Sequence, residues 1–366
     1  MNRATAKAAA TLIASIMSFL GWSVLDYGQY LPEEIGSKIQ FEAPKDIAPR
    51  KENAPRKQAP KASIKQVSLP KANPLTLTPP KAPELPKSPA QNQPVDLSAS
   101  ERITQSTINI LCTMQKSNMI AKYTGSGVFI DPQGIILTNA HVAEHVMLAG
   151  LGFESCTIRT GSPAKSSYKA KVIYLPDAWI QNNKNNLSAE TITGTGESDY
   201  ALLLLTEIIS KNAPNVPLVY LPMSERSVAS GDSVTLAGYP AGFGDVALLD
   251  SALYLLQRQS QIKSIFGFTG NGSDVLDTSP TPLAEHGSSG GAMVADDGKL
   301  VGIMDSVIRD NTGQSAIQGI SISYIKNSIL QNTGKSLSSF IENAKSESDN
   351  FLQTKAPVLA SQLMSL

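Results

Sequence analysis

The chain has 366 residues, of which 41% are apolar and 17% are charged, and 31 basic residues balance 31 acidic ones. A net charge of zero and an aromatic content of 6% give no sign of a basic, base-stacking surface, so nucleic acid is excluded as a partner. The length suits one or two ordinary domains.

An uncharged run, Ala8–Leu25, stands near the N-terminus and covers 18 residues. As a helix it would be about 27 Å long, close to the hydrocarbon thickness of a bilayer. Arg3 and Lys7 precede the run and Asp26 follows it. This charge pattern predicts a cytoplasmic N-terminus with the rest of the chain outside.

Residues 1–41 therefore form a predicted signal region, which is either an uncleaved anchor or a cleaved signal peptide. A cleaved signal normally has a shorter apolar core and a small-x-small cleavage site. The end of the run, Trp22-Ser23-Val24-Leu25, offers no such site, which favours a signal anchor with a transmembrane helix at about 8–25. Either interpretation exports the remainder to a periplasmic or extracellular location, and a cleaved signal would leave it secreted.

The next segment, residues 42–96, contains 12 prolines, ten basic residues, five acidic residues and no aromatic residue. Such a composition cannot bury enough apolar surface to offset its ordering entropy, so it predicts a disordered linker. Frequent proline favours extended polyproline II, with a reach of roughly 170 Å. We interpret it as a tether. A ligand for a proline-recognising domain, and a basic contact to anionic envelope polymers or lipid, are the alternatives.

Residues 97–334 alternate short β-rich runs with Gly, Pro, Asn and Asp, which predicts an all-β sandwich or pair of barrels. Asp131-Pro132-Gln133-Gly134 has the residue order of a type I turn and predicts a hairpin. Helices are expected only at Tyr324–Gln331 and near Ser338–Leu352. The predicted strands are Ile108–Met114, Gly127–Ile130, Ile135–Thr138, Ala170–Tyr174, Ala201–Leu205, Ser233–Ala237, Gly291–Val294 and Leu300–Asp305.

Three fragments carry chemistry. A strand ends in a histidine at Thr138–Val142, an acid precedes an apolar strand at Ser198–Leu204, and a serine lies in a glycine-rich turn at Gly287–Gly291. A serine hydroxyl is a weak nucleophile until an imidazole takes its proton, and a carboxylate must orient that imidazole.

These requirements predict a triad of His141, Asp199 and Ser289. Glycines next to the serine allow main-chain N–H groups to face a developing oxyanion. The predicted donors are the amides of Gly287 and Ser289, with Ser288 as a third candidate.

T-N-A-H, D-x-A-L-L and G-x-S-G-G, in this order, resemble the trypsin-like (chymotrypsin-fold) serine proteases, and most closely their HtrA-type bacterial branch. Thr124–Ile130 and Gln318–Ile322 also resemble segments of that branch. The resemblance covers Asn109–Ile329. It implies two six-stranded antiparallel β-barrels, with His141 and Asp199 in the first barrel and Ser289 in the second.

The chain also departs from that family. The 32 residues after Gly334 leave no room for a PDZ domain, so peptide sensing of the HtrA kind is not expected. Ser288 stands where trypsin-type zymogens have an aspartate, so activation through that ion pair is not expected either. The Glu285-His286 pair is atypical of the family.

Each triad assignment has an alternative. His141 alone could be a core histidine, and Asp199 alone could cap a strand, with Glu197 and Asp177 as distant substitutes. Ser288 is the rival nucleophile. We interpret His145 as a surface residue and His286 as loop filler, and no metal ligand spacing remains.

Cys112 and Cys156 are the only cysteines and flank the His141 segment. In an exported domain such a pair predicts one disulfide, with two buried thiols as the alternative.

The resemblance implies that the substrate pocket is formed by Leu283, six positions before Ser289, and by Ser306 and Val307. These residues predict a small apolar slot that would select Ala, Val or Leu at the cleaved position. Asp277 would instead select Lys or Arg if it reached the pocket floor. The tail, residues 335–366, is predicted to be partly helical, and it either packs on the domain or binds a partner.

The predicted function is a tethered endopeptidase that cleaves protein or peptide substrates through an acyl-enzyme and needs no cofactor. The rival hypothesis is a protease-fold module that binds unfolded or envelope proteins, and a third is a structural envelope tether. The sequence does not predict the oligomeric state.

Overall fold

The computed structural model describes residues 97–364, except 117–118, 184–194, 243–247, 271 and 310–312. The predicted membrane helix and linker lie outside the described residues. Within the described ranges, no helix is both long and apolar enough to cross a bilayer.

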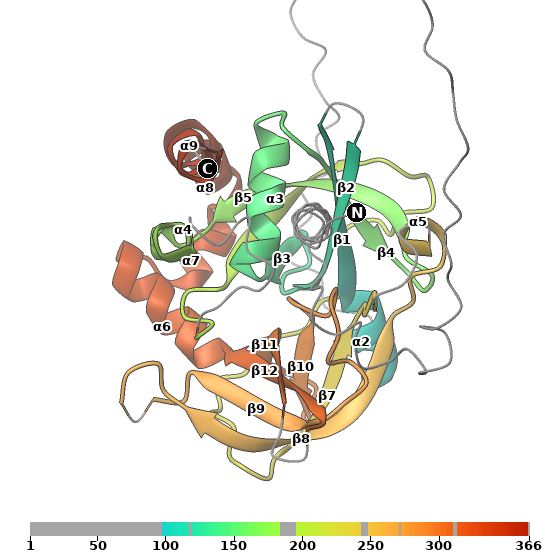
Figure 1. Ribbon diagram of the computed structural model, residues 1–366, viewed down its shortest axis with the longest axis vertical. Coiled ribbons are helices and arrows are strands. Elements are labelled where there is room, and N and C mark those ends of the chain that lie inside the picture. The colour runs from blue at the N-terminus through green and yellow to red at the C-terminus, as the bar shows by residue number, and fades with distance from the viewer. Residues whose placement is uncertain are drawn as a thin grey trace, which may run out of the picture. The chain divides into compact units, whose positions relative to one another are not determined.

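Two closed antiparallel barrels of six strands each make up the fold, as the family resemblance predicted (Figure 1). In sheet order the first barrel contains β1 (Thr107–Lys116), β2 (Met119–Phe129), β3 (Ile135–Thr138), β6 (Ala201–Ile208), β5 (Lys165–Tyr174) and β4 (Ser155–Thr160). The second contains β10 (Ala292–Ala295), β11 (Leu300–Arg309), β12 (Ser315–Ser321), β9 (Val275–Pro280), β8 (Leu256–Phe266) and β7 (Ser233–Gly238).

The predicted turn at Asp131–Gly134 is confirmed as the connection of the β2–β3 hairpin. The amide of Gly134 donates to the Asp131 main-chain oxygen at 3.2 Å, and the Gln133 amide donates to Asp131 Oδ1 at 2.8 Å. This turn sets the direction of β3, which leads directly to the histidine segment.

Helices cover parts of both barrels. They are α2 (Ala99–Ser106), α3 (Ala140–Gly150), α4 (Asp177–Asn183), α5 (Leu248–Ser251), α6 (Ile322–Thr333), α7 (Leu337–Glu342), α8 (Ala344–Asn350), the π-helical segment η2 (Phe351–Lys355) and α9 (Ala356–Met364).

The prediction that helices occur only near the C-terminus was wrong, because α2, α3, α4 and α5 precede that region. The start of α2 does carry a helix signal, since Ser98 and Glu101 form a reciprocal capping box. In α3 the residues are apolar on most sides, and seven of them are buried. A helix of this kind lacks the polar stripe by which a helical period is recognised.

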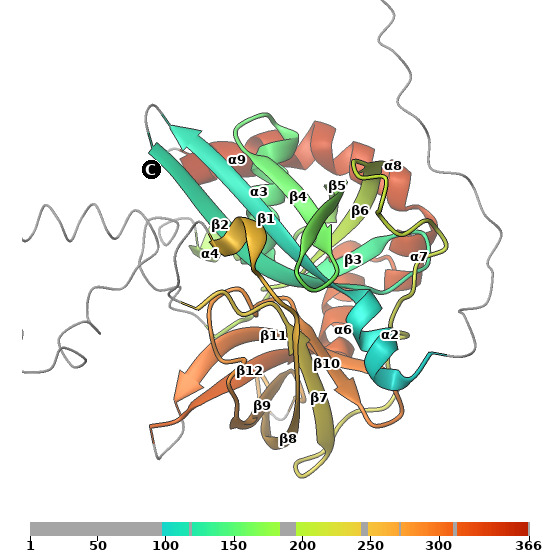
Figure 2. The same ribbon diagram turned by 90° about the vertical axis from the view of Figure 1, so that its right-hand side faces the viewer.

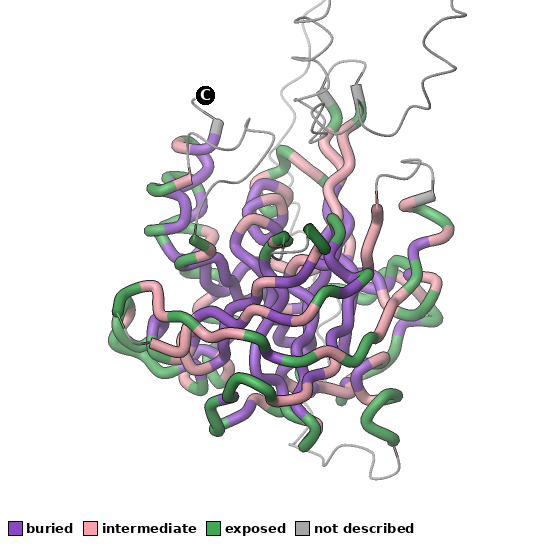
Figure 3. The backbone as a smooth tube through the Cα atoms, turned by 60° about the horizontal axis from the view of Figure 1, so that its bottom comes forward, coloured by how far each residue is buried: buried purple, intermediate pink, exposed green. Residues whose placement is uncertain are grey.

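The C-terminal helices pack against the first barrel beside α3 (Figure 2). Leu359, Ala360 and Leu363 of α9 are buried in the same cluster as Val146 and Met147 of α3. Buried residues run through the interior of the domain (Figure 3). Ile322, Ile325 and Ile329 of α6 belong to a buried cluster with residues of both barrels. The tail therefore belongs to the folded domain. Of the two predicted alternatives, packing on the domain and binding of a partner, the structure shows the first.

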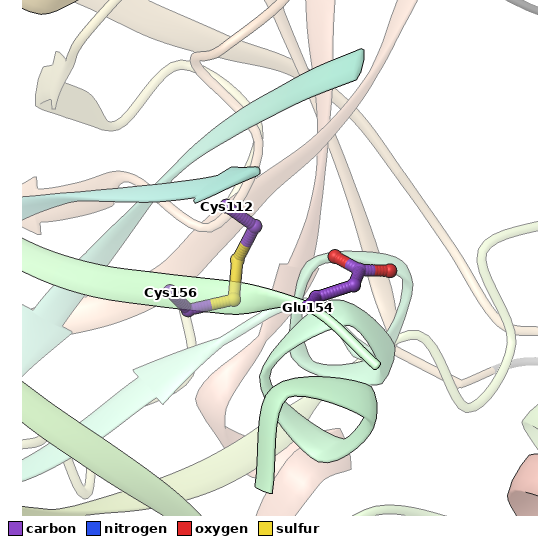
Figure 4. A group of neighbouring side chains, drawn as sticks. All are labelled: Cys112, Glu154 and Cys156. Carbon is purple, nitrogen blue, oxygen red and sulfur yellow. A yellow bond between two sulfur atoms is a disulfide. The ribbon is translucent and has the colours of Figure 1, made fainter. Parts of the chain in front are cut away.

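The disulfide between Cys112 and Cys156 is present, and it joins β1 to β4 where these residues are paired in the register (Figure 4). The two cysteines are 44 positions apart in the sequence, and the bridge closes the chain between them into a loop. That stretch contains β2, β3 and the whole of α3.

Candidate active site

The histidine and the acid meet because β3 and β6 are antiparallel neighbours. Thr138 at the end of β3 pairs with Ala201 at the start of β6. His141 follows β3 by three positions, and Asp199 precedes β6 by two. Adjacent ends of the two strands therefore bring these side chains to one edge of the first barrel.

Asp199 binds His141 twice. Its Oδ1 accepts the main-chain N–H of His141 at 3.0 Å, and its Oδ2 lies 2.7 Å from Nδ1 of the ring. The carboxylate thus serves as the acceptor at the start of α3, where the helix has unpaired N–H groups and partial positive charge. Both contacts fix the ring, and the second assigns the proton to Nδ1.

Burial and charge act in opposite directions on this pair. Burial would lower the pKa of His141, but the charge and the hydrogen bond of Asp199 outweigh it and raise this pKa to about 9. Burial would likewise raise the pKa of Asp199, but the adjacent ring lowers it below its ordinary value. Asp199 is therefore the ionised member, and the imidazolium of His141 is stabilised.

Ser289 lies in the turn that precedes β10, in the second barrel. Gly290 has φ +83°, and a Cβ at this position would lie 2.1 Å from the main-chain oxygen of Ser126. Glycine is required here because the turn passes directly against the first barrel.

Ser126 of β2 holds that turn in place across the barrel boundary. Its N–H donates to the Ser289 main-chain oxygen at 2.7 Å, and its hydroxyl donates to the Gly287 oxygen at 2.7 Å. The amide of Tyr239 donates to the same hydroxyl at 2.9 Å. Ser126 is fully buried, so these bonds are not exposed to competition from water.

The Ser289 hydroxyl donates to the main-chain oxygen of Asp305 at 2.9 Å. The side chain of Asp305 faces the His141–Asp199 pair: its Oδ1 accepts from the Asn139 amide at 3.1 Å, and a carboxyl oxygen lies within 4.8 Å of a carboxyl oxygen of Asp199 and of a ring nitrogen of His141. One residue of β11 therefore contacts both the serine and the His141–Asp199 pair.

The predicted oxyanion donors differ in their availability. The Ser288 amide donates within the turn to the Glu285 oxygen at 3.3 Å. For the amides of Gly287 and Ser289, no acceptor is found among the residues that the structure describes. The hydroxyl of Ser288, the rival nucleophile, is buried, so a substrate at the surface does not reach it.

The predicted pocket residues do not all line a surface. Leu283 is 0% exposed and packs in the core of the second barrel with Met293 and Met304, while Ser306 and Val307 are exposed on β11, Val307 by 47%. The Asp277 carboxylate on β9 is held by Gln318 at 3.0 Å and by the Ser264 hydroxyl at 3.2 Å.

Sequence reasoning missed Asn139, Glu144, Trp179 and Asp305. Trp179 of α4 lies with its ring centroid 6.3 Å from that of His141, and its Nε1 donates to Glu144 Oε2 at 3.4 Å. Burial raises the pKa of Glu144 to about 7. An acid at the end of the apolar run Leu300–Met304 is the same kind of signal that identified Asp199, and it could have identified Asp305.

The remaining candidates have other roles. Asp177 is exposed and forms an ion pair with Lys355 at 2.8 Å, and Glu197 is exposed as well. The interpretation of His145 as a surface residue was wrong, because its ring stacks on Tyr123 at 3.9 Å and lies 3.1 Å from Glu154. His286 lies exposed in its loop.

Among the residues that the structure describes, two groups of side chains have the composition of metal ligands. Cys112, Glu154 and Cys156 form the first, but its sulfur atoms are bonded to each other (Figure 4). His141, Asp199 and Asp305 form the second, with one ligand atom of each within 4.8 Å of the others. These atoms hydrogen-bond among themselves, so neither group offers a set of free ligands.

Two six-stranded barrels, with a histidine and an acid on one and a serine turn on the other, define the class of chymotrypsin-fold peptidases. Residues 125–303 match the family model described as "Trypsin-like peptidase domain". The chain contains a trypsin-like peptidase domain, which is the domain of serine endopeptidases.

Among solved structures, the chain is similar to the active form of the Rv3671c protease from M. tuberculosis. The identity is 16%, the match covers 68% of this chain and 94% of that one, and the TM-score is 0.41. The search of curated proteins found no match.

Proposed function

We propose that this serine endopeptidase uses Ser289 as nucleophile, His141 as general base and Asp199 as the group that orients and stabilises His141. The observation that carries the proposal is the double contact of Asp199 with the main chain and the ring of His141, at 3.0 and 2.7 Å. When the ring is neutral, a carboxylate bound in this way keeps its one proton on Nδ1, so that Nε2 is the unprotonated nitrogen and is directed away from Asp199, as a general base requires.

In the first step the Ser289 hydroxyl must turn from the Asp305 oxygen toward His141. Its proton then moves to Nε2 while Oγ bonds to the carbonyl carbon of the substrate. The developing oxyanion is stabilised by the amides of Gly287 and Ser289. His141 then protonates the leaving amine, and a water molecule deprotonated by the same ring hydrolyses the acyl-enzyme.

A fluorophosphonate probe tests the nucleophile, because it forms a stable bond only with an activated serine. The full-length chain should be labelled, and Ser289→Ala should abolish the labelling. Ser288→Ala is the matched control and should still be labelled. Equal labelling of wild type and Ser289→Ala contradicts the assignment, and a folded wild type without labelling favours a binding module.

For specificity we propose a preference for small or medium aliphatic residues at the cleaved position. The support is chemical: Val307 presents apolar surface on β11, and the Asp277 carboxylate already has two hydrogen-bond partners. An unpaired charge is disfavoured against such surface. Peptide-library profiling tests this, and a strong preference for Lys or Arg would overturn it.

We also propose that the peptidase domain is exported and tethered to the membrane by residues 8–25 through the linker 42–96. The support is the uncharged run after Arg3 and Lys7 and the disulfide, which is typical of oxidising compartments. Protease added outside cells with a permeabilised outer layer should remove the domain and leave a membrane-held stub. A soluble mature form that begins after residue 25 would show cleavage of the signal instead.

A further inference from the structure

Two buried carboxyl groups face each other behind His141. Asp199 and Asp305 are both almost fully buried, one oxygen of each carboxyl group lies within 4.8 Å of the other, and Asn139 Nδ2 donates to both residues. Two ionised carboxylates buried side by side repel each other, so we expect one of the two to carry a proton. Either Asp199 or Asp305 holds this proton.

The hydrogen bonds that each carboxyl group accepts indicate which of the two is ionised. Asp199 accepts two N–H groups from His141, and the ring becomes cationic during the reaction. Asp305 accepts from the neutral amide of Asn139 at 3.1 Å. The ionised form is therefore stabilised more at Asp199.

The surroundings of Asp305 keep this carboxyl out of water. A Cβ added to Gly196, where φ is +77°, would lie 2.6 Å from Asp305 Oδ2. Asn139 also ties the two acids together, since the same Nδ2 donates to the Asp199 main-chain oxygen at 2.8 Å. The two bonds fix the orientation of the Asn139 amide, whose Oδ1 makes no capping bond to α3 and is buried without a hydrogen-bond partner among the described residues.

We propose that Asp305 is a protonated carboxylic acid that donates its hydrogen bond to Asp199 and thereby positions Asp199 against His141. Asp305 is thus a positioning residue, and its proton stays in place during the reaction. For its catalytic consequence this inference rests on the proposed function.

The titratable groups that face Asp305 are Asp199 and His141. Burial and the charge of Asp199 raise the pKa of Asp305 well above its ordinary value, and the charge of His141 opposes this effect only in part. Both effects favour the neutral form of Asp305, in agreement with the close approach of the two carboxyl groups.

The direct test is an NMR titration of the His141 ring in the full-length chain and in Asp305→Asn. The sequence has only three histidines, so the His141 signal can be assigned by substitution of the other two. Asparagine retains a donor and carries no charge. If Asp305 is neutral, the His141 pKa should agree within about 0.3 unit between the two proteins. If Asp305 is ionised, its removal should lower the His141 pKa by about one unit or more, which would overturn the proposal.

A second comparison uses activity. Asp305→Ala, which has no donor, should lower kcat about 30-fold with little change in KM, and Asp305→Asn should recover most of that loss. Equal losses in both variants would overturn the positioning role. If the wild type neither turns over peptides nor binds the fluorophosphonate probe, the proposed function fails. The NMR titration still decides the protonation of Asp305 in that case.

Discussion

At the residue scale, the site is organised around Asp199, which accepts hydrogen bonds from the start of α3 and from the ring of His141, the proposed general base. The first contact is to the main chain of His141 and the second is to its side chain. A single carboxylate therefore couples the position of α3 to the orientation of the imidazole.

The pH dependence of turnover follows from this pair. His141 must be neutral to accept the proton of Ser289, so activity is lost as the pH falls below the His141 pKa. Since Asp199 raises that pKa to about 9, we expect the acid limb of kcat/KM to have a midpoint well above 6.5. A pH–rate profile measures it. A midpoint at or below 6.5 would mean that the ring does not experience the charge of Asp199.

At the element scale, the disulfide and the C-terminal helices both support α3, which carries His141 in its first turn. The disulfide anchors the strands on either side of the β2–α3 segment. The tail covers the outer face of α3 with apolar residues. Each support has its own test.

Replacement of both Cys112 and Cys156 by alanine should lower the free energy of unfolding by about 3 kcal/mol, because the unfolded chain gains conformational entropy. Chemical denaturation of the oxidised protein and of the double variant gives this difference. An unchanged unfolding midpoint would show that the bridge does not contribute. Peptide mass spectrometry without reduction provides the control that the bridge forms in the wild type.

The contribution of α9 can be measured with two adjacent residues. Leu359 is 4% exposed and lies in the core of the first barrel, whereas Val358 is 56% exposed. Leu359→Ala should cost about 2–4 kcal/mol of stability, and Val358→Ala less than about 0.5 kcal/mol. Similar costs for the two substitutions in thermal or chemical unfolding would contradict the packing of α9.

Strands could be predicted from sequence where apolar and β-branched residues form a run, as in β3 and β6. By contrast, β8 was missed because Leu256–Phe266 is polar and half-exposed along most of its length. The triad was recognisable because each member lies in a short local fragment. The apolar run before Asp305 marks this acid as a candidate, but its contact with Asn139 could not be predicted, because the two residues are 166 positions apart in the sequence.

At the scale of the whole molecule, the reaction needs groups from both barrels in fixed relative positions. His141 and Asp199 belong to the first barrel, and the Ser289 turn belongs to the second. Several hydrogen bonds cross between the barrels, and those nearest to the site are made by Ser126 and by Asn139 with Asp305. Activity should therefore respond to these bonds even where no residue touches the substrate.

Ser126→Ala tests the coupling between the barrels. The substitution removes the donor to the Gly287 oxygen and the acceptor of the Tyr239 amide, so buried polar groups lose their partners. We expect kcat to fall about 10-fold and stability to fall by about 1–3 kcal/mol. Ser166→Ala, at an exposed position of β5, is the control and should change neither quantity. If Ser126→Ala has the same kcat as the wild type, the turn that carries Ser289 keeps its shape without these bonds.

The central claim is that His141, Asp199 and Ser289 act as one catalytic unit. The measurement that tests it most directly is kcat for Ser289→Ala, for His141→Ala and for the double variant, on one peptide substrate. Members of one unit are not additive, so each single variant should lose several orders of magnitude and the double variant should lose no more than either. If the two losses multiply in the double variant, or if either single variant retains near-wild-type turnover, the triad assignment is contradicted.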